Sequence, residues 1–531
     1  MKRRNFLGSG LAAATVASTV GSRQASAAPK SPLIQLPGNP NAPIALSEPF
    51  SRSALIVGGG LAGLSAALEL AERGYAVTLR EKGDVLGGRL ATPRLHTSQG
   101  EFAVEHGLHM WFDNYHNFTD IRERLGINKY FRPYNEVFTL YRDYKPEVLK
   151  SQPAIYPLNL LAMLERSPNM NMFSALRQLK MMPQVMAYNH DKIYEQLDDT
   201  KFSDWAPANV SNAFYECFLK PAAGVTLNDP EKVSAAEMVH FMHYYFLGQP
   251  KAMRREVTTV DHATAVLDPW RDRLLELGAK IETGRGVPGL RFKGGCALGE
   301  INSNEEFDHV IMALDVPGLK TVMNGSQALD AASADRLEVL KGRAAQLKVA
   351  PPYKVMRMWF DRRPNDSRWD IIETPQHHPI NLLAQFHLME TESANWAKKT
   401  GGAIIEAHLY ADWKWDNTPD EQVWPSIRDT FLEILPEMQN AQMLDYTVGS
   451  YHNFTSFETG QGLIRPTSDF AKKQGIANLG LAGDWVHTEY PSALMERAVS
   501  TGREAANYCL YEDGIRAARI TMTSKHGPGL L

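Results

Sequence analysis

The stretch Ala54-Leu-Ile-Val-Gly-Gly-Gly-Leu-Ala-Gly63 decides the fold of this 531-residue chain. Its apolar half predicts a buried strand, and the glycines that follow lead straight into a helical pattern. Gly58, Gly60 and Gly63 have the G-x-G-x-x-G spacing of dinucleotide-binding turns. The first glycine permits a tight turn, the second lets backbone approach a pyrophosphate, and the third lets helix and strand pack closely. The free N–H groups of the helix N-terminus can then bind phosphate.

A second apolar strand, Ala76–Arg80, is predicted after this helix. Glu81 follows it directly, at the place where a carboxylate binds ribose hydroxyls in dinucleotide-binding units. The alternative is a glycine-rich turn of an unrelated α/β protein, which would not need a carboxylate there. We therefore predict that a dinucleotide contacts Gly58, Gly60, Leu61, Ala62, Gly63, Glu81 and Lys82.

The next motif, Gly87-Gly88-Arg89, bears on which dinucleotide binds. It lies where a plain NAD-binding domain would usually continue into another helix, and a guanidinium fork suits phosphate oxygens. The two motifs together resemble the FAD-dependent amine oxidase and phytoene desaturase superfamily, in which Gly-Gly-Arg lies along the flavin. The resemblance implies FAD as the cofactor and makes Gly88 and Arg89 cofactor contacts; a surface arginine after a turn is the alternative.

Two later segments extend the resemblance. A short apolar strand ends at Gly483-Asp484, and a helical pattern follows from about Ala493 to Leu510. In the superfamily this Gly-Asp pair meets the ribityl chain and pyrophosphate, and the next helix points its N-terminus toward the isoalloxazine. The resemblance implies cofactor contacts from Gly483 and Asp484, with Met495 or Glu496 near the ring. Taken alone, the aspartate could equally be a helix N-cap. The segment 280–287 resembles the strand and loop that meet adenine through backbone, here at Val287, and 307–317 resembles a strand that re-enters the cofactor domain.

These segments predict an α/β fold, with a discontinuous Rossmann-like FAD-binding domain and an inserted α+β substrate-binding domain. About 500 residues after a leader are too many for one core. The expected parts are a twin-arginine-type signal peptide (1–27), a linker (28–50), an FAD-binding domain (51–125, 252–330 and 440–512), a substrate domain (126–251 and 331–439) and a C-terminal tail (513–531).

The first 27 residues read as an export signal. Arg3 and Arg4 precede a short, mild apolar run, and Ala25-Ser-Ala27 offers a small-residue cleavage site. Paired arginines favour the twin-arginine route, which carries folded proteins, over an ordinary basic leader. We expect a periplasmic or secreted protein. Removing this segment changes the formal net charge from −4 to −8, so no nucleic-acid partner is expected.

The loop Val104-Glu-His-Gly-Leu-His109 resembles the carotenoid desaturase pattern that lines the flavin cavity. A metal site is the alternative for its histidines, but the segment is broken by glycine and lacks an i, i+4 ligand pair, so we expect no metal. Segments 234–250, 265–274 and 493–498 resemble carotene desaturases related to isorenieratene synthase. His106, His109 and Glu496 are the candidate acid–base residues, from their proximity to the motifs.

The resemblance implies hydride transfer to the flavin N5 from a hydrophobic, carotenoid-like or polyene substrate. The alternative is an exported amine oxidase with O2 as acceptor, for which Trp485 and Tyr490 could form an aromatic cage; a third class is a flavoprotein that serves as a scaffold. The methionine-rich stretch 155–188 could form a substrate tunnel, an ordinary core or a peripheral contact with a membrane. The sequence leaves the oligomeric state open.

Overall fold

The computed structural model describes residues 33–35, 39–150, 165–170, 185–249, 251–365 and 368–527. The predicted signal peptide, 1–27, and most of the methionine-rich stretch lie outside these ranges. The described residues belong to one compact unit, Pro32–Leu531.

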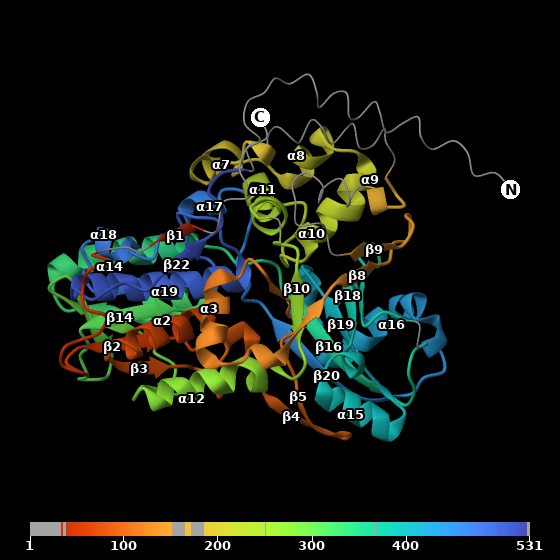
Figure 1. The fold of residues 1–531 in the computed structure, drawn as a ribbon, viewed down its shortest axis with the longest axis horizontal. Helices are drawn as coiled ribbons and strands as arrows, with labels where there is room; N and C mark the ends of the chain where they lie inside the picture. The colour runs from red at the N-terminus through yellow and green to blue at the C-terminus, as the bar shows by residue number, and fades with distance from the viewer. Residues whose placement is uncertain are drawn as a thin grey trace. The chain divides into compact units, whose positions relative to one another are not determined.

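A five-stranded parallel sheet forms the first layer (Figure 1). Its strands, in spatial order, are β11 (Lys280–Glu282), β3 (Ala76–Arg80), β2 (Ser53–Val57), β14 (His309–Ala313) and β21 (Leu479–Ala482). Three distant parts of the sequence therefore contribute to one sheet. This confirms the predicted α/β class with a discontinuous Rossmann-like domain.

Alternate residues of the central strand β2 enter two different cores. Ala54 and Ile56 pack with α2 (Leu61–Ala71), α12 (Asp268–Glu276) and α19 (Leu494–Glu512). Leu55 and Val57 pack on the other face, against helices α13 (Val316–Gly325) and α14 (Ala331–Gln346). Because side chains alternate along a strand, this continuous apolar run is buried on both faces, as expected for a parallel sheet between helices.

A seven-stranded sheet forms the second layer, beside the first (Figure 1). In spatial order it contains β20 (Met443–Tyr451), β16 (Tyr353–Phe360), β19 (Ala403–Leu409), β18 (Leu382–Gln385), β17 (Ile371–Glu373), β8 (Glu136–Thr139) and β9 (Glu147–Lys150). Only the β17–β8 pair is parallel within this sheet. One face packs on α16 (Val423–Ile434) through a core that includes Met356, Ile405 and Phe431.

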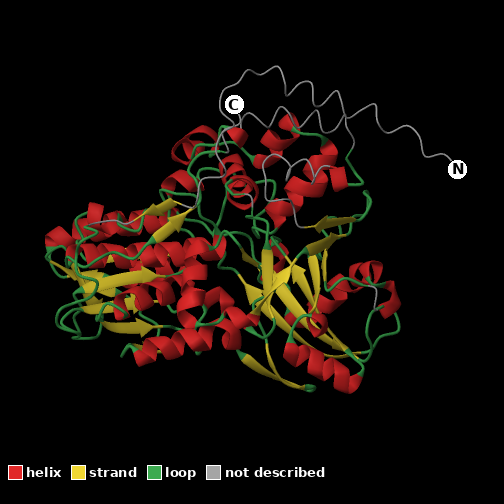
Figure 2. Cartoon of the chain, viewed as in Figure 1, coloured by secondary structure: helices red, strands yellow, loops and turns green. Residues whose placement is uncertain are grey.

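A group of helices lies next to both sheets, as Figure 2 shows. It includes α7 (His190–Leu197), α8 (Phe202–Asn209), α10 (Lys220–Gly224) and α11 (Ala235–Met242). A small sheet of β6 (Trp111–Phe112), β10 (Arg255–Thr258) and β7 (Phe131–Tyr134) joins segments from the two predicted domains. Strands and helices mixed in this way agree with the α+β character predicted for the substrate-binding part.

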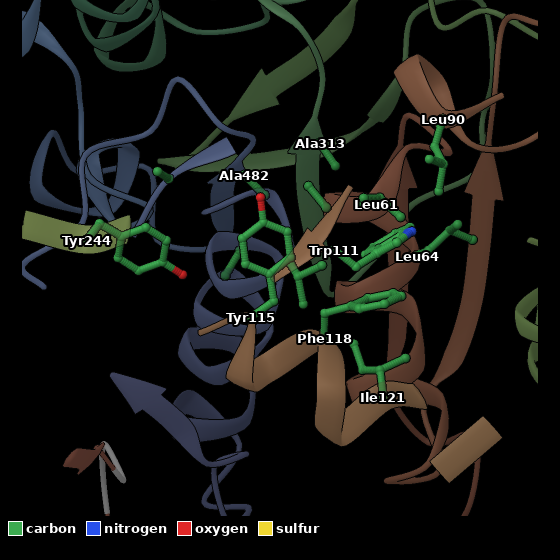
Figure 3. Close-up of a cluster of buried hydrophobic side chains, with 14 of the residues drawn as sticks. Leu61, Leu64, Leu90, Trp111, Tyr115, Phe118, Ile121, Tyr244, Ala313 and Ala482 are labelled. Atoms are coloured by element: carbon green, nitrogen blue, oxygen red, sulfur yellow. The ribbon is translucent and has the colours of Figure 1, made fainter. Parts of the chain in front are cut away.

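One core connects the first helix to the loop before α3 (His116–Leu125) (Figure 3). Trp111 stacks on Phe118 with ring centroids 4.1 Å apart, and Leu61 and Leu64 of α2 lie in the same cluster. The start of α2, where a phosphate would bind, is thus held by the segment that carries the predicted substrate loop.

The domain boundaries themselves stay predictions. Some elements, however, pack with the other domain from the one in which their residue numbers were predicted to fall. Strand β20 falls in the 440–512 segment but pairs with β16, because its alternating residues complete the antiparallel sheet. Helix α14 falls after residue 330 but packs on the parallel sheet through Leu337 and Leu340. The predicted linker and tail contain β1 (Leu33–Gln35) and β22 (Ile520–Met522), which pair with each other and so give regular structure to both segments.

Candidate functional site

Two of the three motif glycines are required by the fold itself. Gly58 has φ 106°, and a Cβ there would lie 2.2 Å from the carbonyl oxygen of Ala313. A Cβ on Gly63 would lie 1.9 Å from the carbonyl oxygen of Gly58. Larger residues at these two positions would push α2 away from the sheet.

Gly60 differs from the other two. Its backbone is extended, with φ −76°, and the nearest atom to an added Cβ would be the Cα of Gly88, at 3.7 Å. The protein itself would therefore tolerate a side chain here. Gly60 begins α2 without any side-chain cap, so the first-turn N–H groups of Leu61 and Ala62 are not satisfied by a capping side chain and could bind an anion.

Glu81 lies at the end of β3 and closes the same turn. Its carboxylate oxygens accept hydrogen bonds from the N–H groups of Gly59 and Gly83, both at 2.7 Å. The loop after β11 lies beside it, since a Cβ on Gly286 would lie 3.3 Å from the Cβ of Lys82. The buried Val287 follows in that loop, so the structure brings the predicted ribose and adenine segments together.

Arg89 and Asp484 bring the two ends of the chain together. Arg89 Nη2 lies 2.6 Å from Asp484 Oδ1, and its guanidinium lies 4.7 Å from the centre of the Phe454 ring. Burial lowers the pKa of Arg89, but the charge and hydrogen bond of Asp484, together with Tyr353 and Asp315, raise it above its ordinary value, so the arginine stays cationic. Gly87 donates to the carbonyl oxygen of Gly59 (2.9 Å), which places this motif against the first turn.

The buried Arg89 Nη1 and Asp484 Oδ2 atoms have no hydrogen-bond partner among the described residues. Buried polar atoms are normally satisfied, so these two are available to a bound polar group. Gly483 next to them has φ 145°, and its N–H and carbonyl are both hydrogen bonded to the Thr501 hydroxyl of α19, at 3.0 Å. With the open side of Gly60, these residues fit a dinucleotide cofactor.

An aromatic group lies beside Arg89: His106, Tyr353, Tyr451 and Phe454. The rings of Tyr353 and Tyr451 are 5.1 Å apart, and His106 lies 4.3 Å from Tyr451. Burial, and then the charge of Arg89, lower the pKa of His106 to about 4, so its imidazole is neutral at physiological pH. The predicted loop thus meets the predicted cofactor arginine, but no motif in the sequence indicated its tyrosine and phenylalanine neighbours.

The other two acid–base candidates lie elsewhere. His109 Nδ1 donates to the carbonyl oxygen of Gly107 (2.9 Å), and His109 lines a small cavity together with Glu105, His262 and Glu390. Glu496 accepts hydrogen bonds from the N–H groups of residues 117 and 118 at the start of α3. Burial raises the pKa of Glu496 to about 7, but these contacts hold it as a helix cap, so the geometry favours only His106 at the cofactor side.

Met495 is half-buried in the first turn of α19 and packs against the core of α2 and α19. The contacts predicted for individual residues with the cofactor stay predictions. Among the described residues, no group of three or more His, Cys, Asp or Glu side chains could hold a metal ion. No helix within the described ranges is long and apolar enough to cross a membrane.

Comparison with known proteins agrees with this geometry. The profile of the family described as flavin containing amine oxidoreductase matches residues 61–510. The chain belongs to this family. Its cofactor is FAD, and the protein is an FAD-dependent oxidoreductase.

The relatives cover nearly the whole chain. A carotenoid phi-ring synthase of Chlorobaculum tepidum is 26% identical over 99% of this chain and 100% of its own length. A carotenoid phi-ring synthase of Streptomyces griseus is 27% identical, over 89% of this chain and 90% of its own. A solved structure of putrescine oxidase bound to putrescine superposes with a TM-score of 0.59 at 14% identity, covering 86% of this chain and 98% of that one. At that identity the structure supports the fold alone.

Proposed function

We propose that this flavoprotein desaturates a long, hydrophobic, carotenoid-like polyene. Relatives named as carotenoid phi-ring synthases and phytoene desaturases align with 85–99% of the chain. The observation in the structure that supports the proposal best is the aromatic group beside Arg89. Flat rings at this position suit a conjugated chain, because aromatic faces bind apolar π-systems through large contact areas.

FAD, when bound, supplies the oxidant, since its isoalloxazine accepts an electron pair as hydride. The residues of the chain have other tasks. The first turn of α2, with Arg89 and Asp484, would hold the cofactor phosphates and ribityl chain. Tyr353, Tyr451 and Phe454 would orient the polyene and exclude water. His106, being neutral, adds no charge beside an apolar substrate.

No observation favours the alternative amine oxidase. The two residues considered for an aromatic cage are both buried elsewhere. Trp485 donates its indole N–H to the carbonyl oxygen of Leu314 and belongs to the core with α13 and α14. Tyr490 is 1% exposed.

Anaerobic mixing of the FAD-loaded protein with candidate substrates tests the proposal. We expect that the visible flavin absorption bleaches with phytoene or β-carotene in detergent micelles, with a desaturated product, and does not bleach with putrescine. Bleaching by putrescine and by neither polyene would reject desaturation and support the amine oxidase.

We also propose that the protein is exported folded, through the paired Arg3 and Arg4 of the leader. Replacing both by Lys keeps the charge of an ordinary leader but removes the arginine pair. We expect the double variant to accumulate inside the cell with its flavin bound. Unchanged export of the double variant would contradict the twin-arginine route.

A further inference from the structure

Three polar residues line one face of strand β19 and its end: Glu406, His408 and Tyr410. They alternate along the strand, so their side chains point to the same side. On β16, Arg357 is paired with Glu406 and Val355 with His408, which places Tyr353 opposite Tyr410 one pair further on. Tyr353 in turn pairs with Tyr451 of β20. This face therefore ends in a row of three tyrosines, two of which belong to the aromatic group.

The three residues form a chain of hydrogen bonds. His408 Nε2 lies 2.9 Å from Glu406 Oε1, and His408 Nδ1 lies 2.7 Å from the Tyr410 hydroxyl oxygen. A carboxylate accepts, so His408 carries its proton on Nε2 and donates it to Glu406. Nδ1 is then bare and accepts the hydrogen of Tyr410. With these hydrogen bonds running from Tyr410 to His408 and from His408 to Glu406, the histidine can take a proton from the tyrosine hydroxyl.

Neighbouring residues hold this hydrogen-bonded row of side chains in place. Arg357 Nε donates to the other oxygen of Glu406 (2.8 Å), and Arg357 Nη1 donates to the carbonyl oxygen of Ala103 (2.9 Å). Glu406 is 0% and His408 1% exposed, whereas Tyr410 is only partly buried. The carboxylate and imidazole are thus shielded from water, whereas Tyr410 at the end of the row is partly accessible.

The predicted substrate loop packs directly on His408. Gly107 has φ 121°, and a Cβ there would lie 3.0 Å from His408 Cε1. The N–H of Leu108 lies 3.5 Å from His408 Nε2, longer than the contact to Glu406. His106 precedes this glycine and contacts Tyr451. The loop therefore covers the imidazole while its other side contributes to the aromatic group.

We propose that Tyr410 is the base that receives the substrate proton, with His408 and Glu406 as positioning residues behind it. This rests on the proposed desaturation. One C–H bond of the polyene gives its electron pair, as hydride, to the flavin oxidant. The neighbouring C–H bond breaks, and its electron pair becomes the new C=C bond. Its proton goes to the Tyr410 oxygen, while the proton of Tyr410 passes to His408 Nδ1. The resulting imidazolium donates to Glu406.

Single-turnover reduction of the FAD-loaded protein tests the role of the hydroxyl. In Tyr410→Phe, we expect the rate constant at saturating polyene to fall about 10²–10⁴-fold, the range for one general base, with the half-saturating concentration unchanged. The control is Tyr446→Phe, a 36% exposed tyrosine of β20, which should reduce at the wild-type rate. A Tyr410→Phe protein that reduces as fast as wild type overturns the proposal.

A second measurement does not depend on turnover. In FAD-loaded protein labelled with ¹⁵N-histidine, the signals of His408, identified by their loss in His408→Gln, should show a protonated Nε2 and a bare Nδ1 whose shift changes in Tyr410→Phe. A proton on Nδ1 overturns the proposed relay. If no polyene reduces the wild-type flavin, the proposed desaturation is wrong, and the catalytic role of Tyr410 and His408 is wrong with it. If polyenes do reduce the flavin but either the Tyr410→Phe test or the ¹⁵N test is negative, only the proton transfer from Tyr410 to His408 is wrong.

Discussion

Two glycine-to-alanine substitutions make the same chemical change in two helices and are expected to change stability in opposite directions. Gly342 lies in α14, where an added Cβ meets nothing within 4 Å. Helix propensity then decides the outcome, and Gly342→Ala should stabilise the protein by about 0.5–1 kcal/mol.

Gly502 lies where α19 packs against α2. A Cβ there would lie 2.1 Å from the carbonyl oxygen of Ala62 and 3.0 Å from the Cβ of Ser65. The two helices would have to separate by about 1 Å, and overpacking of this kind costs about 1–3 kcal/mol. After the gain in helix propensity, Gly502→Ala should destabilise by about 1–2 kcal/mol. It should also weaken FAD binding, since Ala62 is in the first turn of α2.

Urea unfolding followed by circular dichroism, together with FAD titration, measures both effects. The midpoint should move up for Gly342→Ala and down for Gly502→Ala, with the slope unchanged. A Gly502→Ala protein that unfolds at the same or higher urea concentration than wild type, while Gly342→Ala behaves as expected, would refute the close contact of α19 with α2.

Three further predictions follow from buried charges. Arg357→Met removes the cationic partner of the buried Glu406 carboxylate, which keeps only its contact with His408, and should cost about 3–5 kcal/mol of stability. Adding Glu406→Leu should recover most of this loss, and equal losses for the single and double variants in urea unfolding would contradict the prediction. Burial lowers the pKa of His309, but Asp513 (2.7 Å away) and Cys509 together raise it to about 10. The protonated His309 therefore stabilises the fold fully below pH 6.5, the ordinary pKa of histidine, and this stabilisation is lost as the pH rises toward 10. The melting temperature of the wild-type protein should fall across this pH range, and His309→Gln should remove that fall. An unchanged fall in the variant would count against the pairing of His309 with Asp513. Glu81→Ala, which removes the carboxylate between two backbone N–H groups, should weaken FAD binding about 10–100-fold by equilibrium titration, and unaltered affinity would exclude it from the site.

Local motifs predicted the cofactor half of the molecule well. The strand–turn–helix at 54–63 and the strand before Gly483 both lie in one sheet, because parallel strands with glycine turns leave a strong pattern in a short stretch of sequence. The pairing of Arg89 with Asp484 could be expected only from the resemblance to a family, since no local pattern connects residues so far apart.

The substrate half was harder to predict because its groups meet across strands. The segment Glu406-Ala-His-Leu-Tyr410 does alternate polar and apolar residues, which places the polar ones on one face. That signal was present in the sequence, but nothing in it shows that Tyr353 lies opposite. Strand register, which fixes such neighbours, depends on the whole sheet. His109 was misleading for a similar reason: only two residues separate it from His106, yet it lines a small cavity while His106 contacts Tyr451.

Gly60→Ala is the most direct test of the central claim, that the turn at the start of α2 is shaped for FAD and not only for the fold. The structure leaves room for the added Cβ, with no protein atom nearer than 3.7 Å. The cofactor-free variant should therefore melt like wild type, while its FAD affinity, measured by titration, falls at least about tenfold, or about 1.4 kcal/mol. A variant that melts like wild type and binds FAD equally tightly would contradict the account.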